Sequence, residues 1–505
     1  MTPERAPLRV RRETGVGSLA VAALAALVAA CAAGPGFHSP AAPTPVDSTR
    51  PYTSAPLPSR TDSAPVAGGG AQVFVTGKDI PADWWTMLHS DPLDQLIQSA
   101  FDRSPTLEAA KAALREAQAA YSARWGSTLL PGVDAQGAVI RQKASSAAFG
   151  IPGGTLFTLY DASVQVSYNL DVFGGTRRGV EGAAAARDVQ RYQVEAAYLS
   201  LSANLVTTAI LEASLRAQVQ VTRDLVSADS QSLKITEEQA RLGVVDQSTV
   251  LAEETELAQA KAALPGVEAA LAQTRHLLAV YAGRLPSDTG LPEFSLESFQ
   301  LPQDLPVSVP SSLVRQRPDI LASEAVLHEA SAQVGVATAN LFPQIQLSGS
   351  GGWEGLTLSN LFSAPNEVWS LSAGLLAPIF HGGALRAKRR EAVAAFDAAR
   401  AQYEQVVLYA FLNVANTLRA LDADAQTLQA QAAAESLAHQ SVDLVAEQYR
   451  LGAVSYLSLL DAQRSYQQTR IGLIVARATR YADTAALFTA LGGGWWNRPA
   501  GESTK

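Results

Sequence analysis

The sequence predicts a mainly α-helical protein with a small membrane β part, built from a duplicated half-domain with long antiparallel coiled-coil helices. Three observations predict this fold class. Four sequence landmarks occur twice in one order, each copy holds a long run of helix-favouring residues, and between the helices the hydrophobic period changes to two. Because four β-strands per chain cannot close a barrel alone, we expect a shared twelve-stranded trimeric β-barrel.

The duplication sets the expected domain organisation. The landmarks pair Pro105 with Pro318, Pro131 with Pro343, Phe173 with Phe380 and Gly243 with Gly452, at separations of 207 to 213 residues. A period this long indicates a duplicated half-domain, since solenoid repeats are much shorter. We expect repeat 1 at 81–285, a proline-rich connector at 286–310, repeat 2 at 311–494 and a C-terminal tail at 495–505.

Each copy contains one very long helix. The stretch from Ala384 to Arg450 has no proline and no glycine, and its counterpart from Arg177 to Arg241 has glycines only near its start. About 65 residues at 1.5 Å per residue give roughly 100 Å of helix, a length that favours coiled-coil packing. Its expected seam is Val407, Phe411, Val414, Leu418, Leu421, Ala425 and Leu428. A turn and a second helix follow each long helix, so we expect two helical hairpins.

The β part is expected between the first helix and the long helix of each copy. Polar and apolar residues alternate clearly in 163–170 and 344–348 and more weakly in 133–140 and 368–376, with loops at 145–154 and 349–366. An exposed antiparallel sheet packed on helices would alternate in the same way. However, no neighbouring segment is available to cover the apolar face, which favours strands that face lipid.

The N-terminus has the pattern of a lipoprotein signal peptide, expected at 1–30. Four arginines precede an apolar run from Val16 to Ala30, and Cys31 follows as the only cysteine of the chain. An ordinary secretory signal is the alternative, but a sole thiol at this position favours lipid attachment at Cys31. Ala32 follows where an aspartate would favour the inner membrane. We expect an outer-membrane lipoprotein with a lipid-anchored extended tether at 31–80.

Composition and motifs exclude several function classes. The net charge of −8 and the pI of about 5.4 argue against nucleic acid as a partner. The sequence has no phosphate-binding loop, no G-x-S-x-G elbow and no histidines at metal-ligand spacing. We therefore expect no enzyme, no cofactor and no metal.

A series of short motifs runs from shortly after Cys31 nearly to the end of the chain. They are Gly34-Pro35-Gly36-Phe37, Asp83-Trp84-Trp85, Asn169-Leu170-Asp171-Val172-Phe173-Gly174-Gly175, Arg317-Pro318-Asp319-Ile320, Leu460-Asp461-Ala462-Gln463-Arg464 and Ala490-Leu491-Gly492-Gly493-Gly494-Trp495. In this order and spacing they resemble the outer-membrane factor family of TolC-like efflux channels, in its NodT-type lipoprotein branch.

The resemblance implies a homotrimer with an outer-membrane barrel on a long α-helical tunnel in the periplasm. It also implies a passive exit duct for small molecules in a tripartite efflux system of the RND type, with a periplasmic adaptor (membrane fusion) protein and an inner-membrane pump as partners. A duct for type I protein secretion and a non-conducting coiled-coil envelope lipoprotein are the alternatives. The alternating strands disfavour the second, since a scaffold needs none.

The resemblance places a periplasmic gate at the turn after the second long helix, with Tyr449, Leu457, Asp461 and Arg464 at the constriction. Leu457 side chains from three chains would meet as an apolar plug, and Asp461 would add a carboxylate ring that favours cations. Arg464 would pair locally with Asp461. The alternative is a plain surface pair of little energetic weight.

The chain departs from the family pattern at three positions near the turns. Ser458 stands where some relatives carry a second acid, so the ring is expected to be single. Ala240 in the first copy corresponds to Tyr449 in the second. Asp246 is expected to add a charge at the first turn, in a direction that the sequence leaves open.

Overall fold

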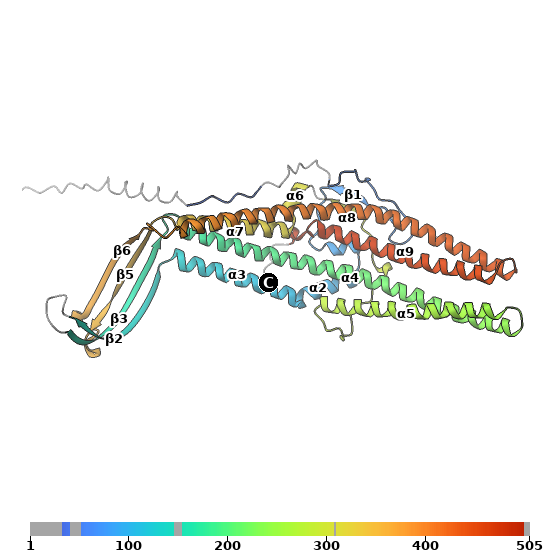
Figure 1. Ribbon diagram of the computed structural model, residues 1–505, viewed down its shortest axis with the longest axis horizontal. Coiled ribbons are helices and arrows are strands. Elements are labelled where there is room, and N and C mark those ends of the chain that lie inside the picture. Colours follow the sequence, from blue (N-terminus) through green and yellow to red (C-terminus); the bar gives the residue numbers. More distant parts are fainter. Residues whose placement is uncertain (1–32, 41–51, 146–153, 308–309, 499–505) are drawn as a thin grey trace, which may run out of the picture. The chain divides into compact units, whose positions relative to one another are not determined.

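A computed structural model describes residues 33–40, 52–145, 154–307 and 310–498 (Figure 1). The chain divides into two compact units. One comprises residues up to Ser39, 115–189 and 324–402, and the other comprises 40–114, 190–323 and 403–505. Each unit is built from both sequence copies, as expected for a duplicated half-domain.

The first unit contains a four-stranded antiparallel sheet in the order β2-β3-β5-β6. The strands are β2 (Gly132–Ser145), β3 (Gly154–Leu170), β5 (Gln344–Gly355) and β6 (Glu367–Leu376). The predicted four strands are therefore confirmed. In the register, Ser167 faces Ser348 across the central pair, and Ser348 donates to or accepts from Ser372 on β6 at 2.7 Å.

The predicted loop at 349–366 is wrong in its first part, because β5 continues to Gly355. Its glycines and serines suggested a loop. In the sheet, Gly352 instead allows β5 to lie close to β3, since a Cβ at this position would collide with the β3 backbone at Ala162 and Ser163. Ser350 and Ser370 then form a cross-strand hydroxyl pair at 2.8 Å.

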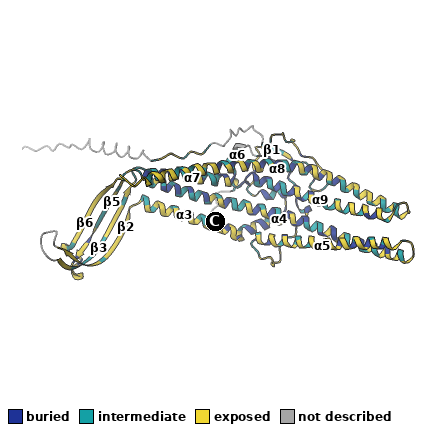
Figure 2. Ribbon diagram, viewed as in Figure 1, coloured by how far each residue is buried: buried dark blue, intermediate teal, exposed yellow. Residues whose placement is uncertain are grey.

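Most residues of the sheet are exposed in the single chain (Figure 2). Every residue of β6 is exposed, and Trp369 and Leu371 are exposed by 78 % and 81 %. The outer edges of β2 and β6 pair with no other described strand. An exposed apolar face and two unpaired edges are features that a soluble sheet avoids.

Two helical hairpins lie mostly in the second unit, and the N-terminal parts of their long helices belong to the first. One joins α4 (Gly175–Arg241) to α5 (Gln247–Tyr281), and the other joins α8 (Ala384–Arg450) to α9 (Tyr456–Ala490). Both long helices and both hairpins agree with the sequence prediction.

The sequence predicted the seam of α8 correctly at every position except one. The buried residues are Tyr403, Val407, Ala410, Val414, Leu418, Leu421, Ala425, Leu428 and Ala432. Ala410 occupies the seam in place of Phe411. From Ala410 the buried residues follow in two steps of four, to Val414 and then to Leu418. These steps keep the line of buried residues close to the 3.6-residue period of a straight helix. Phe411 is half-buried and contacts the Tyr52 ring, with 5.9 Å between ring centroids.

Shorter elements complete the fold. Helices α2 (Asp91–Arg103), α3 (Pro105–Leu129), α6 (Pro310–Gln316) and α7 (Pro318–Ala339) precede the strands of each copy, and short 3-10 turns include η1 (Trp84–Leu88) and η3 (Leu296–Ser298). The parallel pair of β1 (Val73–Thr76) and β4 (Asp304–Val307) was not predicted.

The N-terminal segment is better packed than its composition suggests. Within the stretch expected to be an extended tether, 31–80, Thr61, Ala64 and Gln72 are buried. The fully buried Arg480 of α9 explains this, because it donates hydrogen bonds to the Thr61 hydroxyl at 3.1 Å and to the Gly70 carbonyl at 2.8 Å. A buried guanidinium requires acceptors, and this segment supplies two of them, both to Nη2.

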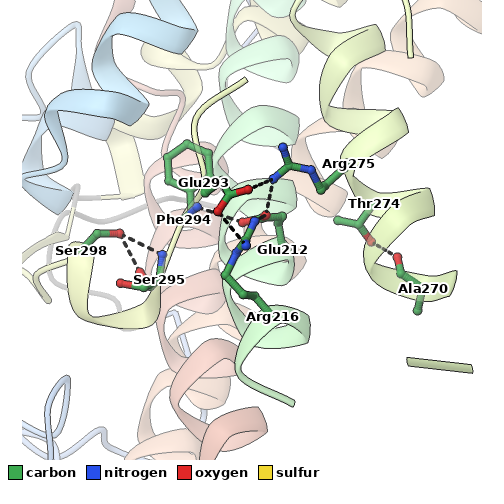
Figure 3. A network of polar contacts seen from close by, with 9 residues as sticks. All are labelled: Glu212, Arg216, Ala270, Thr274, Arg275, Glu293, Phe294, Ser295 and Ser298. Carbon is green, nitrogen blue, oxygen red and sulfur yellow. Dashed lines mark hydrogen bonds and ion pairs between the residues drawn. The ribbon is translucent and has the colours of Figure 1, made fainter. Parts of the chain in front are cut away.

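The connector between the copies is fastened to the first hairpin by a fully buried carboxylate (Figure 3). Glu212 of α4 accepts hydrogen bonds from Arg216 at 2.5 Å, from Arg275 of α5 at 2.9 Å and from the Phe294 backbone N–H at 3.0 Å. Glu293 contacts the same two arginines at 2.9 and 3.7 Å but is 65 % exposed. The connector therefore has a fixed path at this point.

Helix α4 contains one 18-residue window apolar enough to cross a membrane by composition, with half of the window buried inside the fold. A buried core helix passes the same test, because its apolar face packs on neighbouring helices.

Candidate functional site

The two hairpin turns have nearly identical backbone geometry. Gly243 and Gly452 both adopt the left-handed conformation, with φ of 76° and 72°. In each turn the last arginine of the long helix pairs with the glutamate three residues earlier, Arg241 with Glu238 and Arg450 with Glu447, and both Nε–Oε2 distances are 2.8 Å. The arginine hydrogen bonds lower the pKa of both glutamates.

The residues that begin the second helix of each hairpin differ in charge. Asp246 caps α5 by accepting the Thr249 backbone N–H at 2.9 Å, and these local hydrogen bonds lower its pKa. Ser455 caps α9 by accepting the Ser458 N–H at 3.2 Å. Asp246 is thus a helix N-cap, a role that its position before Ser248 and Thr249 could have suggested.

The predicted gate residues gather at the second turn. The Tyr449 ring lies against the Tyr456 ring, with 5.3 Å between centroids. Leu457 is 63 % exposed in the single chain, and the side chain of Asp461 is exposed to the same extent. Leu457 and Asp461 are one helical turn apart at the start of α9 and face solvent.

Arg464 has a different main partner from the one expected. Its guanidinium forms an ion pair with Glu256 of α5, whereas its Nη1 lies 3.7 Å from Asp461 Oδ1. The expected local pair is therefore secondary to a contact between the two hairpins. Sequence reasoning missed it because a contact between residues 208 positions apart leaves no periodic signal.

Tyr456 also joins the two hairpins near the turns. The Tyr456 hydroxyl donates to Glu253 Oε2 of α5 at 2.5 Å and shares a hydrogen bond with the Ser232 hydroxyl of α4 at 2.8 Å. Glu253 is 1 % exposed, whereas the adjacent Glu254 is exposed. The alternation of a buried and an exposed glutamate follows from their 100° separation on the helix.

A second acidic pair, Asp424 and Asp483, is half-buried. Asp424 of α8 is half-buried, and burial together with a hydrogen bond to Asp483 of α9 raises its pKa to about 7. The two carboxyls lie near the buried Arg480, whose charge lowers the pKa of Asp424 only in part.

The described residues contain no group of three His, Cys, Asp or Glu side chains placed to hold a metal ion. His328 instead contacts Glu181 at 2.8 Å through Nε2 and stacks on Phe37 at 4.2 Å between centroids. This stacking holds the segment around Phe37 against α7. Ala33 also donates to the Phe173 carbonyl at 2.8 Å. Cys31 and the signal peptide lie outside the described residues.

Comparisons with known proteins agree with this architecture. The sequence profile of the outer membrane efflux protein family matches residues 96–284 and 309–493, one block in each copy. Among curated relatives, the pyoverdine export outer membrane protein OpmQ of Pseudomonas putida is 30 % identical over 452 residues, covering 88 % of this chain and 94 % of OpmQ. The probable efflux pump outer membrane protein TtgC of the same species is 27 % identical over 482 residues, covering 95 % of this chain and 96 % of TtgC.

Among solved structures, the outer-membrane channel OprN superimposes with a TM-score of 0.82 at 26 % sequence identity. The superposition covers 92 % of this chain and all of the OprN chain. The similarity therefore includes the sheet as well as the two helical hairpins.

Proposed function

The chain belongs to the outer membrane efflux protein family, and on this premise we propose that three copies assemble into one conducting channel. The protein is an outer-membrane efflux channel component. The observation that supports a trimer is the sheet, whose two open edges and exposed apolar face leave a membrane-inserted monomer with unpaired backbone groups. Three sheets of four strands would pair every edge in a twelve-stranded barrel.

The proposed partners are a periplasmic adaptor and an inner-membrane pump. The name of TtgC places that relative in an efflux pump, and OpmQ is named for export. The two hairpins of this chain end in turns with exposed apolar residues, which suits contact with an adaptor at that end. The transport step itself is passive conduction through the channel.

We assign the gate to Tyr449, Leu457, Asp461 and Arg464. The supporting observation is the pair of Leu457 and Asp461, which are exposed on one face of α9 immediately after the turn and contact no covering element in the described single chain. Around a threefold axis, Leu457 would supply the plug and Asp461 a ring of like charges. Three carboxylates several ångströms apart repel by roughly a few kcal/mol at an effective dielectric constant near 20.

The experiment measures assembly and conduction together. Native mass spectrometry of the purified protein in detergent is expected to show a trimer, and planar bilayers are expected to show cation-preferring channels. Leu457→Ala with Asp461→Ala should raise closed-state conductance and reduce cation preference. Leu437→Ala, an exposed leucine on α8 away from the turn, is the matched control. A stable membrane-inserted monomer would contradict the trimer, and unchanged conductance and selectivity would place the gate elsewhere.

A further inference from the structure

The two faces of the four-stranded sheet differ in charge as well as in polarity. Cross-strand partners share a face, so the register assigns each strand residue to one face or the other. The face that we call the apolar face carries Val139, Tyr160, Tyr168, Trp353, Trp369 and Leu371. The opposite face carries three carboxylates, Asp134, Asp161 and Glu354, and no lysine or arginine among the described strand residues.

Both cations of the sheet lie on the apolar face, at the end of β2 that is farthest from α3. Arg141 and Lys143 are the cross-strand partners of Thr158 and Leu156 of β3, and both are exposed. Arg141 Nη1 donates to the Thr158 hydroxyl at 3.1 Å. The Lys143 stem lies over Gly154, where an added Cβ would be 3.3 Å from Lys143 Cε. Both side chains therefore lie across the β2–β3 pair.

Neither cation has a carboxylate partner in the part of the chain that the structure describes. Arg141 contacts only the neutral Thr158 hydroxyl, and Lys143 forms no hydrogen bond or ion pair. The one carboxylate on the apolar face of the described strands is Glu367, which the register places level with Gly137, four residues before Arg141. Unpaired cations on a face that meets lipid are costly in the hydrocarbon and tolerated only near a bilayer surface.

The length of the sheet agrees with a position at the bilayer surface. The rise along β3 from Leu170, at the helical end, to Thr158 is about 40 Å at 3.3 Å per residue. A strand tilt of about 40° reduces this rise to a height of about 30 Å, which is the thickness of the hydrocarbon core. Arg141 thus lies at the level of the headgroups when the helical end of the sheet lies at the opposite surface. Tyr160, just inside that level, suits an aromatic girdle.

We propose that Arg141 and Lys143 bind the phosphate of a lipid headgroup, in the leaflet farthest from the helices. This inference rests on the proposed barrel, in which the apolar face meets lipid. The two residues alternate on one strand about 7 Å apart, so one headgroup can reach both. The guanidinium supplies a bidentate donor and the ammonium a second positive charge. Because the chain has a net charge of −8, this cationic pair differs from its surface as a whole.

The site is tested by native mass spectrometry of the full-length trimer in a neutral detergent, with lipid A as the probe. Lipid A that carries its phosphates is expected to bind in up to three copies per trimer. Arg141→Gln with Lys143→Gln should weaken this binding about tenfold or more, because charge-assisted hydrogen bonds are lost. Lipid A without phosphates should bind the parent and the double variant alike, and excess inorganic phosphate should leave the bound lipid in place.

The matched control removes the same charge from the helices. Lys234→Gln with Lys261→Gln changes two exposed lysines of α4 and α5 and should keep the parent's affinity for lipid A. Equal affinities of the parent and the Arg141/Lys143 double variant would overturn the proposal. Displacement of the lipid by inorganic phosphate would also overturn it, because the site would then take a free anion.

An ion pair with Glu367 of the next copy around the barrel is the competing role for these cations. It predicts that the double variant loses the trimer and that Glu367→Gln loses it too. If the double variant does not assemble, Lys143→Gln alone is measured in the same way, and an affinity equal to the parent's would count against the lipid site. A parent without trimers would contradict the proposed channel, whereas trimers without phosphate-dependent lipid binding would contradict this site alone.

Discussion

The buried carboxylate of Glu212 provides a quantitative test of how the connector is held. Substitution by glutamine keeps the size of the side chain but removes the charge that two arginines and the Phe294 N–H share. Removal of one partner from a buried ion pair costs about 3–5 kcal/mol. Arg216 and Arg275 are each close to 30 % exposed and retain Glu293, so we expect a smaller loss of about 2–3 kcal/mol.

The assay is amide hydrogen exchange of the connector around Phe294 in the assembled protein. A loss of about 2–3 kcal/mol corresponds to a local opening constant roughly 30 to 150 times larger. Glu293→Gln is the matched control, because that carboxylate contacts the same arginines but is 65 % exposed and should change exchange severalfold at most. Equal effects of Glu212→Gln and Glu293→Gln would refute the argument from burial.

Two further predictions concern the anchor and the Asp424–Asp483 pair. Intact mass spectrometry should show a mature chain that begins at Cys31 with lipid attached, and Cys31→Ser with a functional signal should still form trimers; an unmodified Cys31 would rule the anchor out. Because the pKa of Asp424 is raised from 3.8 to about 7, the folded state binds its proton more tightly, and the resulting stabilisation is present below pH 4 and lost as pH rises through 7. Asp424→Asn should therefore flatten the pH dependence of the unfolding temperature between pH 4 and pH 8, while a dependence equal to the parent's would contradict this role for Asp424.

Regular elements could be predicted from the sequence because their signals are local and repeated. The absence of helix breakers defined Ala384–Arg450, and the four strands followed from alternation in two equivalent places. The β1–β4 pair was missed because two four-residue strands more than 200 positions apart have no period of their own. The seam prediction included Phe411 because it assumed strictly alternating steps of four and three residues. In the straight helix the buried position is Ala410 instead.

The candidate site was predicted less completely than the fold. Tyr449, Leu457 and Asp461 lie together near one turn, as the motif order implied, and their role as a gate remains a proposal. The contacts of Tyr456 and Arg464 with α5 depend on how two hairpins from different copies pack, which neither copy encodes alone. Burial of Glu253 and Asp229 has the same origin, since helix faces that look polar in sequence become interior where helices meet.

The two hairpin turns share one backbone but differ in the charge of the cap, aspartate at 246 and serine at 455. In a trimer, six turns of alternating kind would surround the axis. A partner that bound only the main chain would find six equivalent docking positions, and one that responded to charge would find three. In such a ring the main chain would have sixfold pseudosymmetry, whereas the cap charges would have threefold symmetry. The cap residues would therefore fix the rotational register of a partner that binds the ring.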